Sequence, residues 1–192
     1  MAMMNAIKQR RPPRVGRRLC AVFFALAMVF SCAAQDNLLE NPGFEILDPD
    51  TARPLGWTAW SEPNYAVYTL ADARGGVACV AITDPSATVS QGLRSPRVPV
   101  EPGRAYRASA WARIEGGEKP GLALYLEFWA GGSRIANTSV TLPSTPDWRE
   151  LTLAGQAPEG ATHATVLVYS GSASIGRGYF DDLSLVETPA VP

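Results

Sequence analysis

From residue 37 onward the chain consists of short runs in which apolar and polar residues alternate, separated by Gly, Pro and Asp. Alternation of this kind places successive side chains on opposite faces of a β-strand. No sustained helical period appears in this part of the chain. Many short strands with turns between them predict an all-β fold, an antiparallel β-sandwich. The clearest runs are residues 105–113, 122–129, 164–169 and 178–185.

The first 34 residues differ from the rest. Six basic residues and no acidic one precede a twelve-residue apolar stretch, Leu19–Phe30, and small residues follow it. This order is typical of a secretory signal, and twelve apolar residues are too few for a membrane span. We therefore expect residues 1–34 to be a signal peptide and the protein to be exported.

The end of this leader has two interpretations. Val29–Cys32 resembles a lipobox, in which bacteria lipidate the cysteine, although Phe30 is bulkier than the motif prefers. Lipidation of Cys32 would anchor the protein to a membrane as a periplasmic or cell-surface lipoprotein. The alternative is plain cleavage after Ala33 or Ala34, which would leave the protein secreted and soluble.

The charge and the cysteines of the remaining chain limit its partners. The leader holds six of the 17 basic residues and none of the 18 acidic ones, so the rest has a net charge of −7. Without a basic run it has no electrostatic reason to bind nucleic acid. Cys79 is the only cysteine outside the leader, so an internal disulfide is excluded and a buried apolar role is expected. We expect one domain over residues 37–187 and a tail over 188–192.

Five motifs stand in a fixed order along this domain. They are Asn37–Glu45 (NLLENPGFE), Gly56-Trp57, Pro102–Tyr106 (PGRAY), Trp148 and Tyr179–Leu185 (YFDDLSL). Together they resemble the carbohydrate-binding modules of families four/nine and twenty-two, which share a galactose-binding-domain-like jelly roll. The resemblance covers residues 37–187, and it implies a jelly-roll β-sandwich.

The resemblance also implies a structural calcium ion. In these families the N-terminal Glu and the first Asp of the C-terminal motif meet, because the first and last strands lie side by side. The corresponding side-chain ligands are Glu45 and Asp181, with carbonyls from Gly43 and from the Arg74-Gly75 loop. Such oxygen ligands suit Ca²⁺. The alternative is that Glu45 caps a turn and Asp181 accepts backbone hydrogen bonds.

Alternation predicts which side chains leave the core. If Leu124 and Leu126 point inward, then Tyr125, Glu127 and Trp129 point outward together. The same alternation puts Trp111 and Arg113 outside on the run 105–113, and Tyr169 outside on the run 164–169. The candidate binding face, predicted to lie across three strands, consists of Trp111, Arg113, Tyr125, Glu127 and Tyr169.

This set of residue types suits a sugar. Aromatic rings pack on the apolar face of a pyranose, while Arg and Glu bind its hydroxyls. The spacing of Tyr125 and Glu127 resembles the ligand-contacting Tyr-x-Glu of the family twenty-two modules. The alternative is structural: Trp111 packs beneath a loop, and Arg113 with Glu127 forms a plain cross-strand ion pair.

These patterns lead to one functional prediction and one rival. We expect an exported, stand-alone and monomeric module that binds a polysaccharide or oligosaccharide without catalysis. The rival is a structural or protein-binding domain of the cell envelope that has the fold and no sugar site. Enzyme activity is not expected, because His163 has no Ser or Cys nucleophile motif and the acidic residues are scattered.

Overall fold

The computed structural model describes residues 35–61 and 66–189, which belong to the unit formed by residues 34–192. The predicted signal peptide, with the lipidation candidate Cys32, and the last residues of the predicted tail lie outside the described residues. Every described element is a β-strand, and all strand pairs are antiparallel. Within this part of the chain, no helix has the length and apolar content that a membrane span requires.

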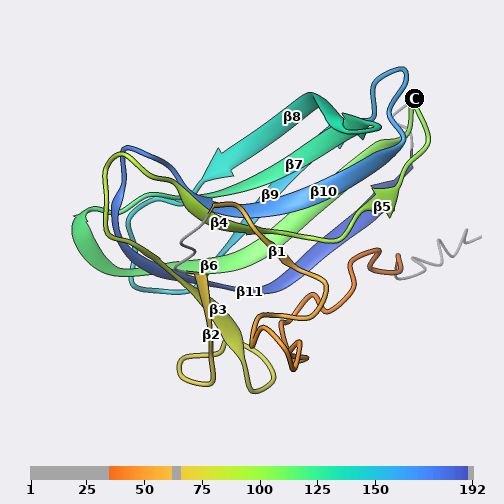
Figure 1. Cartoon of the computed structure of the whole chain (residues 1–192). Helices are drawn as coiled ribbons and strands as arrows, with labels where there is room; N and C mark the ends of the chain where they lie inside the picture. The colour runs from red at the N-terminus through yellow and green to blue at the C-terminus, as the bar shows by residue number, and fades with distance from the viewer. Residues whose placement is uncertain (1–34, 62–65, 190–192) are drawn as a thin grey trace, which may run out of the picture. The chain divides into compact units, whose positions relative to one another are not determined.

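The strands form two sheets (Figure 1). The first sheet has the order β1-β4-β10-β7-β8, with β5 also paired to β10. Its strands are β1 (Thr58–Ala59), β4 (Gln91–Arg94), β5 (Val98–Pro99), β7 (Leu122–Ala130), β8 (Ser133–Thr141) and β10 (His163–Ser170).

The second sheet has the order β2-β3-β11-β6-β9. Its strands are β2 (Ala66–Thr69), β3 (Cys79–Asp84), β6 (Ala105–Lys119), β9 (Arg149–Gln156) and β11 (Ile175–Thr188). The predicted antiparallel β-sandwich is therefore confirmed.

The core lies between the two sheets and follows the predicted alternation. On β7 every second residue from Leu122 to Phe128 is buried, and on β6 the same holds from Tyr106 to Ile114. The rings of Tyr106 and Phe128 meet across the core with centroids 6.2 Å apart. Each large apolar side chain buried here contributes about 1.5–3 kcal/mol relative to exposure, so the alternating positions hold the sheets together.

The two ends of the described chain meet along β11. The backbone N–H of Leu38 donates to the carbonyl of Leu185, and the N–H of Leu183 donates to the carbonyl of Pro42. The amide side chain of Asn37 bridges the same stretch of β11. The N-terminal motif therefore lies beside the C-terminal motif, as the resemblance implies.

Candidate functional site

The outer face of the first sheet carries a continuous set of polar and aromatic side chains. Tyr125, Glu127 and Trp129 alternate with buried leucines and Phe128 on β7, as predicted. On β10, Thr165 lies opposite Glu127 and Leu167 lies opposite Tyr125. Residues that lie opposite one another in an antiparallel pair point to the same face, so the two strands build one surface.

Glu127 is the centre of this surface, and its side chain is completely buried. Arg94 donates from Nε to its carboxylate at 2.8 Å, and Arg134 donates from Nη1 at 2.6 Å. Thr165 donates its hydroxyl at 3.0 Å and in turn accepts the indole N–H of Trp129 at 2.9 Å. A buried carboxylate is tolerated only when it is paired and hydrogen-bonded, and this network supplies both.

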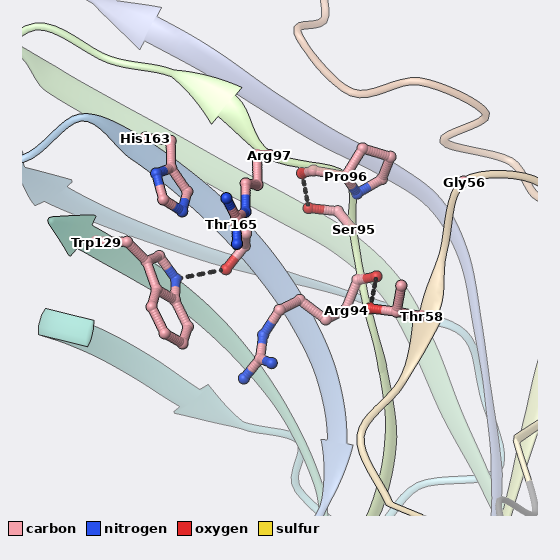
Figure 2. Close-up of a pocket in the computed structure, with 9 residues that line it drawn as sticks. All are labelled: Gly56, Thr58, Arg94, Ser95, Pro96, Arg97, Trp129, His163 and Thr165. Atoms are coloured by element: carbon pink, nitrogen blue, oxygen red, sulfur yellow. Dashed lines mark hydrogen bonds between the residues drawn. The ribbon is translucent and has the colours of Figure 1, made fainter. Parts of the chain in front are cut away.

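A pocket of about 310 Å³ opens at the Trp129 end of the surface (Figure 2). Trp129 and His163 stack with nearly parallel rings, 5° apart, whose centroids are separated by 6.1 Å. Figure 2 shows the guanidinium of Arg94 pointing toward the Trp129 side of the pocket. Burial, and then the nearby charge of Arg97, hold the pKa of His163 below its usual range, so this imidazole is neutral at neutral pH.

A smaller pocket of about 130 Å³ lies at the Tyr125 end. The ring of Tyr169 is in edge contact with Trp60 at 5.3 Å and with Tyr125 at 5.5 Å. Its hydroxyl donates to Ser90 at 2.6 Å, which fixes the ring. Arg94 lies between the two pockets, with its guanidinium 4.7 Å from the Trp60 ring and 5.0 Å from the Trp129 ring.

The predicted binding face is wrong in one respect: its five residues do not share a sheet. Tyr125, Glu127 and Tyr169 lie on the first sheet, whereas Trp111 and Arg113 belong to β6 in the second. The alternation on each strand was predicted correctly. The error arises because alternation fixes the face of a residue within its own sheet and says nothing about which strands share that sheet.

On the second sheet the two misassigned residues take part in a different set of contacts. The guanidinium of Arg74 lies over the ring of Trp111, 3.6 Å from its centroid. Arg113 lies 4.1 Å from the ring centroid of Tyr179 and pairs with Asp72 at 3.1 Å. The ion pair considered between Arg113 and Glu127 is therefore wrong, since each has partners on its own sheet.

The candidate metal ligands lie together where the chain ends meet. Asp181 is fully buried and accepts the backbone N–H groups of Arg74 at 2.8 Å, Gly75 at 3.1 Å and Asp182 at 2.7 Å. Burial raises the pKa of Asp181, and the three N–H donors act against that rise. The loop thus uses its N–H groups to hold this carboxylate.

Glu45 is held by the same loop in the same way. Its carboxylate accepts the N–H groups of Val77 at 3.1 Å and of Ala78 at 3.3 Å. Gly76 has a positive φ of 57°, and a Cβ there would overlap the Glu45 carboxylate, so the contact requires glycine. Gly43 lies beside the Glu45 side chain.

These contacts are those of a capped loop. Arg74 and Gly75 turn N–H groups toward Asp181, where a cation would need oxygen donors. Among the described residues, no group of three or more His, Cys, Asp or Glu side chains could hold a metal ion. The carboxylates of Glu45 and Asp181 are thus held by backbone N–H groups, and calcium binding by Glu45, Asp181, Gly43 and Arg74 stays a prediction of the family resemblance.

The family is established by sequence. The family model for carbohydrate-binding modules 4 and 9, described as a carbohydrate binding domain, matches residues 36–174. The chain belongs to this family. The match extends from the N-terminal motif to the residue before β11, so it covers the whole first sheet and every strand of the second sheet except β11. A search of curated protein sequences finds no match.

Solved structures of this family's fold are similar to the chain over most of its length. A xylan-binding family 22 module from Paenibacillus barcinonensis Xyn10C is 19% identical, with a TM-score of 0.58 over 82% of this chain and 98% of that one. A family 61 module in complex with β-1,4-galactotriose is 22% identical, with a TM-score of 0.54 over 80% and 99%. These likenesses establish the fold of a carbohydrate-binding module.

Two longer proteins contain the same fold as one part. The chain spans 21% of the enzymatically active domain of bacteriophage CBA120 tailspike protein 4, at a TM-score of 0.60 and 14% identity. It spans 26% of an α-L-arabinofuranosidase, at a TM-score of 0.63 and 17% identity. Each match covers 79% of this chain.

Sequence reasoning missed several residues on the outer face of the first sheet. Arg94 lies on a four-residue strand and Arg134 follows a Gly-Gly turn, so neither belongs to a run with clear alternation. Thr165 lies within the run 164–169 but is a small polar residue, and His163 directly precedes that run. A usable signal was the outward position of Glu127: a carboxylate flanked by apolar residues requires cationic partners, and an arginine on a neighbouring strand is the expected one.

The predicted burial of Cys79 is confirmed, and two tryptophans of the motifs also have structural positions. Trp57 is buried in the core, with its ring 4.9 Å from that of Phe44. Cys79 is a buried free cysteine, and burial raises the pKa of its thiol to about 12. Trp148 is half-buried against the small cluster that Cys79 forms with Tyr179. These side chains support the sandwich and do not contribute to the surface on the first sheet.

Proposed function

We propose that the outer face of the first sheet binds a polysaccharide or oligosaccharide chain. The observation that carries this proposal is the position of Trp60, Tyr125, Trp129 and Tyr169 around two adjacent pockets, with Arg94 between them. Aromatic rings pack against the apolar faces of pyranoses, and the arginines supply hydrogen bonds to their oxygens. Membership of a carbohydrate-binding domain family supports the same conclusion.

Glu127 has a positioning role in this proposal. Its carboxylate is buried and both of its oxygens already accept hydrogen bonds. It therefore holds Arg94 and Arg134 in place and does not contact a ligand. Fixing the arginines beforehand lowers the entropic cost of binding.

Binding is proposed to occur without chemical change to the sugar. Glycoside hydrolysis requires two carboxyl groups across the scissile bond. Among the described residues that line the two pockets there is no Asp or Glu. The surface supplies aromatic rings and hydrogen-bond donors, which are the groups that bind a sugar without hydrolysing it.

Affinity electrophoresis and calorimetry against a panel of soluble polysaccharides test this function. Trp129→Ala and Tyr125→Ala should each weaken binding about tenfold or more, since each removes a ring contact worth ~0.5–1.5 kcal/mol besides its buried area. Trp111→Ala, on the other sheet, is the matched control and should bind as the parent does. Full binding by both first-sheet variants would place the ligand elsewhere.

The location of the protein is a separate proposal, which rests on the leader and Cys32. We propose that the protein is exported and that Cys32 is lipidated. Cys32→Ser should then release it from membranes and abolish labelling with a fatty-acid analogue. A mature N-terminus at Gln35 in the parent would show plain cleavage and a secreted protein.

A further inference from the structure

The outer face of the first sheet is positively charged within an acidic chain. In the part of the chain that the structure describes, it carries Arg94, Arg97 and Arg134 against the carboxylate of Glu127. Residues 35–192 together hold 11 basic and 18 acidic residues. Since no Asp or Glu lines either pocket among the described residues, the local field favours a negatively charged ligand.

Arg97 is the cation available to such a ligand. It lines the larger pocket and is exposed. In the part of the chain that the structure describes, its guanidinium makes no hydrogen bond or ion pair, whereas Arg94 and Arg134 are both held by Glu127. Its charge also helps to lower the pKa of His163, after the larger effect of burial, which shows that it acts within this pocket.

The carboxylate and two of the hydroxyls at the larger pocket are already in use. Both oxygens of Glu127 accept hydrogen bonds. Thr165 donates to Glu127 and accepts from Trp129, and Ser95 donates to a backbone carbonyl and accepts a backbone N–H. The charged groups in the lining are the guanidinium donors of Arg94 and Arg97. A carboxylate only accepts hydrogen bonds and carries the opposite charge, so it matches these donors.

We propose that the larger pocket binds an acidic sugar residue, a hexuronate, with Arg97 as the direct partner of its carboxylate and Trp129 as the ring contact. This inference rests on the proposed function and names its ligand class. The planar fork of an arginine matches a carboxylate with two parallel hydrogen bonds. The pocket volume of about 310 Å³ lies at the lower end of the range for small-ligand sites, ~300–1,000 Å³.

The test compares acidic polymers with their neutral counterparts. Polygalacturonate, alginate and glucuronoxylan are each assayed before and after chemical reduction of the carboxyl groups, which leaves the same backbone without charge. At about 0.15 M salt, charges more than ~8 Å apart are screened, so a remaining preference reports close contact. We expect at least one acidic polymer to bind about tenfold or more tightly than its reduced form.

Two variants that each remove one positive charge show which arginine causes the preference for the acidic polymer. Arg97→Gln should remove most of the tenfold preference, because it weakens binding of the acidic polymer far more than binding of the reduced polymer. Arg107→Gln removes an exposed arginine from β6 in the second sheet and should change neither. Thermal melts check that both variants are folded.

The remaining outcomes are distinguishable. Equal binding of acidic and reduced polymers, or a preference that survives Arg97→Gln, would overturn this inference and leave the proposed function intact. Binding of no polymer of either kind would overturn both. Dextran sulfate separates carboxylate recognition from general charge: binding that matches the uronates and weakens alike in Arg97→Gln and Arg107→Gln would overturn the hexuronate assignment.

Discussion

The outer faces of the two sheets carry the same kinds of side chain, arginines and aromatic rings, and differ in how deeply the acids that pair with the arginines are buried. On the second sheet the arginines cover the rings: Arg74 lies over Trp111 at 3.6 Å and Arg113 over Tyr179 at 4.1 Å. On the first sheet the buried carboxylate of Glu127 holds Arg94 and Arg134.

The comparison shows what one buried acid does: Glu127 holds its arginines so that pockets stay open beside the rings of the first sheet, whereas arginines cover the rings of the second sheet. Arg94 is held by Glu127 between Trp60 and Trp129, so that pockets open on either side of it. The acids that pair with Arg113 and Arg74, namely Asp72 and Asp182, are at least one-third exposed. Exposed ion pairs contribute little, and there the cation–π contacts decide where the arginines lie.

The largest effect is expected at Asp181, which supports the second sheet. Asp181→Ala removes a fully buried carboxylate and leaves three part-buried backbone N–H groups without their acceptor. An unsatisfied donor costs about 1–3 kcal/mol when it is buried, so we expect a loss of ~3 kcal/mol in the free energy of unfolding for the three together. Chemical denaturation measures it. An unchanged midpoint would show that the loop is not held by Asp181.

The same variant tests calcium. A ligand that binds only the folded protein at a hundred times its dissociation constant adds about 2.7 kcal/mol. A calcium ion bound by Glu45 and Asp181 would therefore raise the Tm of the parent by several degrees over a chelated sample, and Asp181→Ala would erase the difference. Coinciding parent melts from a verified metal-free sample would leave Asp181 as a hydrogen-bond acceptor alone.

The next prediction compares the buried ion pairs of Glu127 with the exposed ion pair of Asp72. Glu127→Gln removes a buried charge from two arginines, and because these are partly exposed we expect a loss of about 1–3 kcal/mol, below the full cost of a broken buried pair. Asp72→Asn removes an exposed partner of Arg113 and should cost under about 1 kcal/mol. Glu127→Gln should also weaken sugar binding. Equal costs for the two variants would break the contrast between the faces.

A smaller effect is expected for the ring on the second sheet. Trp111→Ala removes a half-buried ring and its contact with Arg74, and a cation–π contact at an exposed site contributes ~0.5–1 kcal/mol. We expect a Tm lower by a few degrees with unchanged sugar affinity. Loss of affinity in a folded Trp111→Ala protein, seen by calorimetry, would make the second sheet a binding face as well.

The smallest effect concerns the sole histidine, His163, on the first sheet. Its folded-state pKa is lowered by burial, so the unfolded chain takes up a proton at a higher pH than the folded one. Its contribution to stability is therefore present above the unfolded pKa of about 6.5 and is lost as pH falls through that value. From pH 7.5 to 5.5 the Tm of the parent should fall more than that of His163→Gln. Parallel curves would contradict the assigned shift.

Much of the fold could be predicted, because the signals for it are local. The inward positions of Leu124 and Leu126 and the burial of Cys79 follow from alternation or from neighbouring residues. The candidate site was predicted only for the part that lies on β7 and β10. Arg94 and Arg134 were missed because each lies in a short or polar segment, and their role depends on a partner 33 and 7 residues away along the chain.

The connection between β6 and β7 shows where sequence reasoning stops. Only Pro120 and Gly121 separate the two strands, a spacing that normally indicates a hairpin within one sheet. Here the chain instead crosses from the second sheet to the first. That crossing moved Trp111 and Arg113 to the opposite side of the sandwich from Tyr125 and Glu127.

The sequence by itself determined that this is an all-β domain, which side chains on each strand enter the core, and which family it belongs to. These are properties of a period-two pattern and of motifs read along the chain. The tertiary structure alone decided which outward residues share a face, and that Glu127 holds two arginines between aromatic rings. The reason is that strand neighbours are set by packing between segments distant in sequence, which a local repeat does not encode.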